Sequence, residues 1–244
     1  MAETDTGTTF NYRPLYIQVK DSLIRRLIDG AWQPGQIIPS EMELAREIGV
    51  SQGTIRKALD VMTAENLLVR RQGRGTYVAE PAESRILFQY FRIVPDSGEA
   101  SFPDSSILRW SRERANGAER ESLMLPKEAA VWRIARIRNL GGVPAIAETI
   151  SLSATRFTGF EALTSIPNNL YRLYSENWRI TIARAREKLN AVAASRSDAS
   201  ALDCAEGTPL LRIVRVAFDL EGNPVELRVS RCLTNQTHYL SELK

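Results

Sequence analysis

Residues 39–78 read PSEMELAREIGVSQGTIRKALDVMTAENLLVRRQGRGTYV, and this stretch decides the fold of the N-terminal part of the chain. Ser40 and Glu43 have the spacing of a capping box, in which the serine accepts from a free backbone N–H and the glutamate reaches back. We expect this first helix to end at Gly49 and a second helix to be capped by Ser51 directly afterwards. Two short helices joined this tightly predict a helix-turn-helix.

The second of these helices has an apolar face and a polar, basic face. Its apolar residues fall at i, i+3, i+4 and i+7, which makes one buried stripe of Ile55, Ala58, Leu59 and Met62. The side chains that project away from this stripe near the start of the helix are Gln52, Gly53, Arg56 and Lys57. Because Gly53 carries no side chain, the start of the helix can approach DNA closely.

A hairpin with a cationic tip is expected after the two helices. Leu67–Arg71 and Thr76–Val78 read as strands, and residues 72–75 (QGRG) form the turn between them. The glycines permit positive φ and let the backbone come close to another surface. Taken alone, this is a solvated surface hairpin. Directly after a helix-turn-helix, it predicts a wing that lays Arg74 in a minor groove or against phosphate.

Upstream of the quoted stretch, one more helix is expected. Pro14 suits its first turn, and Gly30 suits its C-terminal cap. Its apolar residues repeat every four positions at Leu15, Val19, Leu23 and Leu27.

Charge is concentrated in one part of the N-terminal segment. Residues 1–80 contain ten Lys or Arg and ten Asp or Glu, so the segment as a whole is neutral. Residues 50–78 contain five basic and two acidic residues, a local charge of +3. A polyanion contact is therefore expected within 50–78.

Composition excludes several classes of protein. The sequence contains no run of 18 apolar residues, so no membrane span is expected. The acidic start MAETDTGTT lacks the apolar core of a signal peptide, and we expect residues 1–11 to be a disordered tail. Cys204 and Cys232 lie far apart, which argues against a disulfide scaffold and favours a reducing, cytoplasmic location. The sole histidine, His238, argues against a His-based zinc cluster and a hydrolytic triad. We expect no metal or other cofactor.

Residues 12–79 resemble the winged-helix domain of GntR-type bacterial transcription regulators. Thr54, Arg56, Gly73 and Arg74 match the family pattern, but Met42 and Gln52 stand where the family often has arginine, so the operator preference is expected to differ from the commonest family site. The resemblance implies DNA contacts from the starts of both helices and from the wing. The residues expected to make them are Ser40, Glu41, Ser51, Gln52, Gly53, Thr54, Arg56, Lys57, Arg71, Gly73, Arg74 and Gly75.

The rest of the chain is rich in predicted strands and contains an internal repeat. After a polar linker at 80–85, we expect a strand over Ile86–Val94 and a loop over 95–106. Residues 131–152 and 210–233 each read apolar-Arg-Ile-x-Arg, a strand, a Gly turn, a proline and a strand containing a glutamate. This repeat predicts two equivalent hairpins in one sheet. Between the hairpins we expect a short helix over 169–177, a strand over 180–192 and a helical turn over 197–202.

Residues 86–244 resemble the UTRA domain of the HutC subgroup of GntR regulators, which has the chorismate-lyase-like fold. The region 86–118 departs from the subgroup, because it lacks the usual Phe-Thr-Glu opening and the glycine that follows it, and part of the pocket wall is therefore expected to differ. The rival effector domain of the family, FCD, is wholly helical and metal-binding, and the two hairpins and single histidine argue against it. The predicted fold class is therefore α+β: a winged helix-turn-helix domain at 12–79, then an α/β effector domain with a mixed or antiparallel sheet.

The same resemblance implies a pocket for a small anion. Members of the family that bind phosphosugars hold the anion with an Arg-x-Arg pair, which Arg136 and Arg138 match. Alternate residues on a strand share a face, so both guanidiniums can converge on one carboxylate or phosphate. The other matching positions are Glu148, Asn169, Arg184 and Glu226. Cys232 stands where phosphosugar binders can have tyrosine. The alternative is that arginine and glutamate on opposed strands form plain cross-strand ion pairs.

The sequence thus predicts a DNA-binding transcription regulator, a repressor, that reads a palindromic operator as a homodimer. Its effector is expected to be a sugar phosphate, an amino acid or a carboxylate. Two alternatives remain open. The C-terminal domain could serve only for dimerisation of an architectural DNA-binding protein, or it could be an enzyme, because its fold is shared with a lyase. No acid–base pair at a defined spacing supports the enzyme.

Overall fold

The computed structural model describes residues 13–80, 90–97 and 103–241. Contacts between Cα atoms divide the chain into two units, Met1–Glu80 and Pro81–Lys244, which are described separately below. Four sequence expectations fall wholly or partly outside the described residues: the tail at 1–11, most of the linker at 80–85, the first part of the expected strand at 86–94, and the middle of the expected loop at 95–106.

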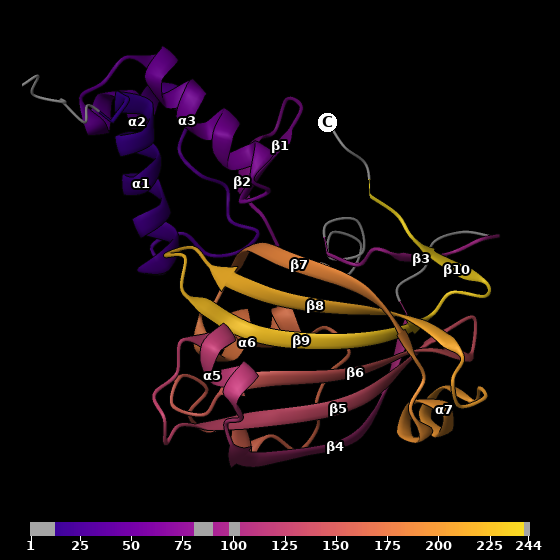
Figure 1. The fold of residues 1–244 in the computed structure, drawn as a ribbon. Helices are drawn as coiled ribbons and strands as arrows, with labels where there is room; N and C mark the ends of the chain where they lie inside the picture. Colours follow the sequence, from indigo (N-terminus) through magenta and orange to yellow (C-terminus); the bar gives the residue numbers. More distant parts are fainter. Residues whose placement is uncertain (1–12, 81–89, 98–102, 242–244) are drawn as a thin grey trace, which may run out of the picture. The chain divides into compact units, whose positions relative to one another are not determined.

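The N-terminal unit contains three helices and a two-stranded hairpin (Figure 1). The elements are α1 (Leu15–Ile28), α2 (Glu41–Ile48), α3 (Gln52–Ala64), β1 (Leu68–Arg71) and β2 (Gly75–Val78). Ser40 and Glu43 form the expected capping box, and the Ser51 side chain accepts from the backbone N–H of Thr54. The stripe expected on α3 is fully buried against α1 and α2. On α1, Val19 and Leu23 are buried, but Leu15 is 51% exposed, so the buried stripe begins one turn later than expected.

The second unit is built on a six-stranded sheet with the order β4-β5-β6-β9-β8-β7, and every neighbouring pair is antiparallel. The strands are β4 (Asp104–Arg114), β5 (Ala130–Leu140), β6 (Val143–Ser153), β7 (Ile182–Ala193), β8 (Pro209–Asp219) and β9 (Pro224–Leu233). A separate two-stranded ladder pairs β3 (Ile93–Pro95) with β10 (Thr237–Tyr239). The loop expected at 95–106 overlaps strands at both of its ends, because β3 includes Pro95 and β4 begins at Asp104.

The sheet consists of two copies of one unit, joined between β6 and β9. Each copy runs strand, short helix, hairpin: β4, α5 (Gly117–Leu123), β5 and β6, then β7, α7 (Arg196–Leu202), β8 and β9. Asn116 and Ser195 occupy the same place in the two copies, and each caps its helix with a capping box. The helix of each copy packs on the hairpin of the other, α5 on β9 and α7 on β6. The repeat expected from the hairpins therefore extends further, over a strand and a helix.

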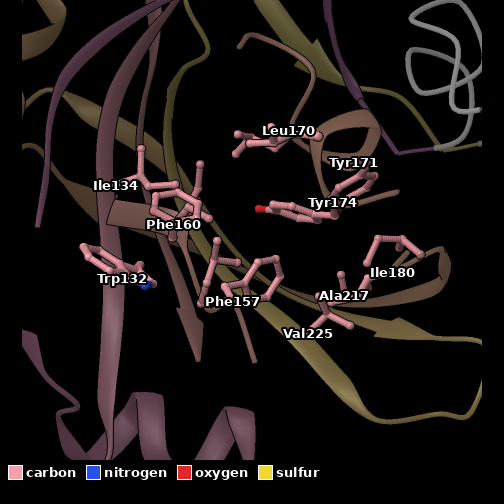
Figure 2. Packing of buried hydrophobic residues seen from close by; sticks show 14 of the residues in the cluster. Trp132, Ile134, Phe157, Phe160, Leu170, Tyr171, Tyr174, Ile180, Ala217 and Val225 are labelled. Atoms are coloured by element: carbon pink, nitrogen blue, oxygen red, sulfur yellow. The ribbon is translucent and has the colours of Figure 1, made fainter. Parts of the chain in front are cut away.

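The two faces of the sheet are covered differently, with α5 and α7 on one face and α6 (Leu170–Trp178) on the other (Figure 1). Under α6 lies an aromatic core in which Trp132 stacks on Phe160, and Phe157 meets Tyr174 edge to face. Figure 2 shows this core. Further along the α6 face, Ile93 packs with Ile146, Ile213 and Cys232. Charged side chains lie between these two apolar clusters. In the described part of the chain, we find no helix long and apolar enough to cross a bilayer.

Candidate functional site: a basic winged surface and an arginine-lined hollow

The start of α3 is arranged around one carboxylate, that of Glu41. Its oxygens accept from Arg56 Nε at 2.9 Å, from Arg70 at 3.2 Å and from Gln52 Nε2 at 3.4 Å. Arg70 also reaches Asp60 at 2.8 Å, so it is shared between two acidic groups. Glu41 thus joins α2, α3 and β1 and fixes the direction of two arginines, in the part of the chain where the sequence predicts DNA contacts.

The surface of α3 next to this carboxylate is open. A Cβ placed on Gly53 would meet nothing closer than the Ser51 hydroxyl at 3.9 Å. Ser51 and Thr54 are within hydrogen-bond distance of each other at 2.9 Å, and Lys57 lies over the Tyr16 ring at 4.3 Å. The first turn of α3 can therefore lie against another molecule without any side chain from Gly53 holding it away.

The hairpin β1–β2 presents Arg74 at its tip. Gly73 and Gly75 on either side have φ of +70° and +105°, values that favour glycine. The Tyr77 hydroxyl donates to the backbone carbonyl of Arg74, and Arg71 stacks on the Tyr77 ring at 4.4 Å. Within the described part of the N-terminal unit, the Arg74 guanidinium makes no ion pair, unlike Arg56 and Arg70.

In the second unit, a hollow lies on the α6 face of the sheet, with a volume of about 290 Å³ when its part open to solvent is included. Arg136 and Arg138 of β5 line it together with Asn169 at the start of α6, and the sequence predicts all three. The other lining residues are Tyr90, Phe91, Leu170, Tyr171, Arg215 and Arg228. Four arginines from the strands β5, β8 and β9 therefore line one space, which can hold an anion by several charged hydrogen bonds.

A second hollow adjoins the first, because Phe91, Arg215 and Arg228 line both. It has a volume of about 340 Å³ with its open part included. Its polar lining includes Glu148 and Ser230, which are bonded to each other at 3.1 Å. The rest of its lining is mainly apolar and comprises Ile93, Ile146, Ile213 and Cys232, with Arg92.

Arg136 and Glu148 form a buried ion pair across the first hairpin. They are register partners in the β5–β6 ladder, and Arg136 Nε donates to Glu148 at 2.7 Å. Burial alone would raise the pKa of Glu148, but the positive charges of Arg136, Arg228 and Arg138 outweigh it and hold this pKa well below its usual range. Glu148 is therefore ionised at neutral pH.

Arg138 is almost as deeply buried, with 2% of its surface exposed. Its guanidinium donates to the Pro103 carbonyl and to the Asn168 side chain, both at 3.2 Å, and lies over the Phe91 ring at 5.2 Å. Burial lowers the pKa of Arg138 to about 9; Glu148 opposes this shift, and the neighbouring arginines reinforce it. Burial therefore disfavours the charged form of this guanidinium.

Glu226 is fully buried but lines neither hollow. Its two oxygens accept from Arg228 Nε and Nη2, both at 2.9 Å, and from the Tyr174 hydroxyl at 2.7 Å. Figure 2 shows Tyr174 and its hydroxyl within the core beside Leu170. This arrangement orients Arg228, so Glu226 acts on the hollows through the arginine.

Arg184 lies on the opposite face of the sheet from the hollows. A β-bulge between Ile182 and Arg184 shifts the register, so Ile182 and Ala185 both pack into the core under α6. Arg184 instead stacks on Phe218 at 3.9 Å, and Phe218 belongs to the cluster under α5. Of the six residues predicted for the pocket, Arg136, Arg138, Asn169 and Glu148 therefore line the hollows, and Arg184 and Glu226 do not.

Sequence reasoning missed Arg215 and Arg228, both of which line the two hollows. The internal repeat could have found them. Arg215 occupies the place in β8 that Arg136 has in β5, and Arg228 faces it across the ladder as Glu148 faces Arg136. Glu148 and Arg228 therefore hold equivalent positions in the two copies, because each lies opposite the equivalent arginine. Aligning the hairpins by the glutamate that each contains hides this equivalence.

Comparison with protein-family models matches each unit to a separate family. The family described as bacterial regulatory proteins, gntR family, matches residues 15–78, and the UTRA domain matches residues 101–238. The second match alone covers more than half of the chain.

Similar proteins come from several bacteria. The Escherichia coli K12 protein named "Probable fructoselysine utilization operon transcriptional repressor" is 28% identical over 237 residues, which are 97% of this chain and 96% of the relative. The histidine utilization repressor of Pseudomonas putida is 41% identical over 107 residues, 44% of this chain and 43% of the relative.

Among solved structures, the ligand-binding domain of a GntR-family regulator from Bordetella bronchiseptica has a TM-score of 0.59 at 32% identity. That likeness covers 63% of this chain and 96% of the other. PhnF from Mycobacterium smegmatis shares the fold at 22% identity, with a TM-score of 0.55 over 92% of this chain and 98% of the other.

Proposed function

This chain belongs to the GntR family of bacterial regulatory proteins and carries a UTRA domain, and from that premise we propose how it works. It is a transcription regulator and not an enzyme. A homodimer represses transcription by binding a palindromic operator through α3 and the wing. A small anion enters the arginine-lined hollow, favours a different arrangement of the two DNA-binding units, and releases the operator.

The DNA-binding part of the proposal is supported by the surface around α3. Gly53 leaves the first turn of the helix open, and Gln52, Arg56 and Lys57 lie around it. Arg74 adds a guanidinium at the wing tip that makes no ion pair within the described N-terminal unit. One short helix contacts too few bases for specificity in a genome, so two copies reading a palindrome are needed.

The observation that carries the effector part is the meeting of Arg136, Arg138, Arg215 and Arg228 around one hollow. Buried arginines are costly unless they are matched by negative charge. Three glutamates contact three of them: Glu148 bonds Arg136, Glu187 bonds Arg215 and Glu226 bonds Arg228. An anion bound in the hollow would add further charged hydrogen bonds to these guanidiniums. Within this proposal, Asn169 and Glu148 contribute at the edges of the ligand, and Glu226 holds Arg228 in position.

The test of the DNA-binding part uses labelled duplexes that tile the region upstream of the gene. We expect one duplex to bind far more tightly than the others, with two chains per duplex by native mass spectrometry, and to lose affinity steeply as salt rises. A duplex that carries only one half of the palindrome should bind much more weakly. Equal binding of all duplexes, or one chain per full operator, would contradict the proposal.

A further inference from the structure

The start of α3 carries an exposed amide, that of Gln52, which is the first residue of the helix. The next residue is Gly53, whose missing side chain leaves the surface beside the amide open. Gln52 and Arg56 are four residues apart, so they lie on the same side of the helix, and both are exposed. A molecule that lies along the start of α3 therefore meets the amide and the guanidinium together.

The carboxylate of Glu41 fixes the direction of this amide. Glu41 Oε2 accepts from Gln52 Nε2 at 3.4 Å and from Arg56 Nε at 2.9 Å. An ionised carboxylate can only accept hydrogen bonds, so the nitrogen of the amide, and not its oxygen, faces Glu41. This bond uses one N–H of the amide. The oxygen and the second N–H are left for another partner, and they form an acceptor and a donor side by side.

From this arrangement, we propose that Gln52 reads an adenine in each half of the operator, through the major-groove edge of the base. The inference deepens the function proposed above and rests on it. Adenine presents an acceptor, N7, beside a donor, the N6 amino group, and this pattern matches the N–H and the oxygen of the amide. Guanine presents two acceptors, N7 and O6. The amide oxygen would then face an acceptor, and one hydrogen bond would be lost.

A base edge suits the Gln52 amide better than a phosphate does. Arg56 and Arg70 donate to the same carboxylate, at 2.9 and 3.2 Å, and their guanidiniums make stronger, charge-assisted bonds to phosphate than a neutral amide can make. A phosphate contact from Gln52 would also carry no sequence information. The bond to Glu41 restricts the rotation of the amide before DNA arrives, so less freedom is lost when two bonds to one base form.

Single-base changes in the operator test the inference. Each base pair of the half-site is changed in both halves of the operator found with the tiled duplexes, and anisotropy gives the affinity of the full chain. We expect one A·T pair whose change to G·C weakens binding of the wild-type chain by about tenfold or more and leaves binding of Gln52→Ala unchanged. At the same pair, 7-deazaadenine replaces the N7 acceptor by a C–H group. It should weaken binding of the wild-type chain and not of Gln52→Ala.

A change of the reading side chain makes the test sharper. Gln52→Arg replaces the amide by a group that only donates, so we expect this variant to prefer G·C at the same pair. The matched control is Gln236→Arg, which adds the same charge at an exposed glutamine of the second unit and should keep the preference for A·T.

Two results separate the failure of this inference from the failure of the proposed function. If Gln52→Ala and the wild-type chain lose the same affinity at every changed pair, Gln52 does not read adenine, although the DNA-binding function stands. If the wild-type chain binds no duplex in preference to the others, the proposed function fails, and this inference fails with it.

Discussion

Arg74 is the residue on which the wing depends, because no carboxylate in the described N-terminal unit competes for its guanidinium. We predict that Arg74→Ala weakens operator binding by about tenfold and lowers the slope of log affinity against log salt by about one. Fluorescence anisotropy with the operator duplex at several salt concentrations measures both effects.

The matched control for this change is Arg196→Ala, which removes an arginine side chain that is 93% exposed in the other unit. It should leave both the affinity and the salt slope unchanged. If the two variants behave alike, the wing arginine does not contact the duplex.

Glu41 limits the charge that α3 and β1 present, because it accepts from both Arg56 and Arg70. We predict that Glu41→Gln raises affinity for scrambled duplexes and lowers the ratio of specific to non-specific binding by about three- to tenfold. The two arginines then reach phosphate without a fixed direction. Anisotropy with operator and scrambled duplexes gives this ratio. An unchanged ratio would mean that Glu41 has no part in orienting these arginines on DNA.

Glu148 makes stability depend on pH. Its pKa lies well below its usual value in the folded chain, so the unfolded chain binds the proton more readily. The contribution of Glu148 to stability is present above its unfolded pKa of about 4.3 and is lost as the pH falls towards the folded pKa. Glu148→Gln should be less stable at neutral pH and should lose less stability on acidification. Denaturant unfolding at several pH values checks this. The control is Glu128→Gln, which removes a carboxylate from an exposed pair with Arg114, and an equally steep loss of stability in both variants would contradict the prediction.

At the scale of the element, the hairpin β1–β2 depends on Gly75 more than on Gly73. An added Cβ at Gly75 would lie 3.0 Å from Ile37 Cδ1, at a φ of +105° that alanine rarely adopts. At Gly73, nothing lies within 4 Å and φ is +70°. We predict that Gly73→Ala costs about 1 kcal/mol of unfolding free energy and Gly75→Ala clearly more. Denaturant unfolding ranks the two variants, and equal costs would contradict the account of this turn.

The elements that the sequence predicted well are those with a clear apolar period or a cap. Ile55, Ala58, Leu59 and Met62 gave α3 its buried stripe, and Ser40 marked the start of α2. The strand β4 was missed for the opposite reason. It is an edge strand whose sequence DSSILRWSRER alternates poorly, because a bulge between Ile107 and Arg109 breaks the period and its side chains are mostly half-exposed or exposed.

The directions of the pocket side chains were also predicted correctly only where the strand is regular. Simple alternation places Arg136 and Arg138 on one face, and the structure has both of them in the first hollow. Alternation fails at Arg184, because the bulge beside Ile182 turns it to the other face. No local feature of the sequence marks that bulge. The position of Arg228 could be read only by superposing the two copies of the repeat.

At the scale of the whole molecule, the sequence predicted the order of the domains, with a winged DNA-binding domain followed by a sheet that contains two equivalent hairpins. The ion pair of Glu187 with Arg215 could not be predicted from the sequence, because it depends on the register of β7 against β8.

The central claim is that an anion bound in the arginine-lined hollow lowers the affinity of the winged unit for DNA. It is tested most directly by anisotropy of the labelled operator bound to the full chain, while a panel of sugar phosphates, amino acids and carboxylates is added at constant ionic strength. The account predicts that at least one compound releases the wild-type chain and, at the same concentration, leaves Arg138→Gln bound. Release of the operator from both chains at the same concentration would contradict it. A wild-type chain that stays bound to the operator in the presence of every compound would also contradict it.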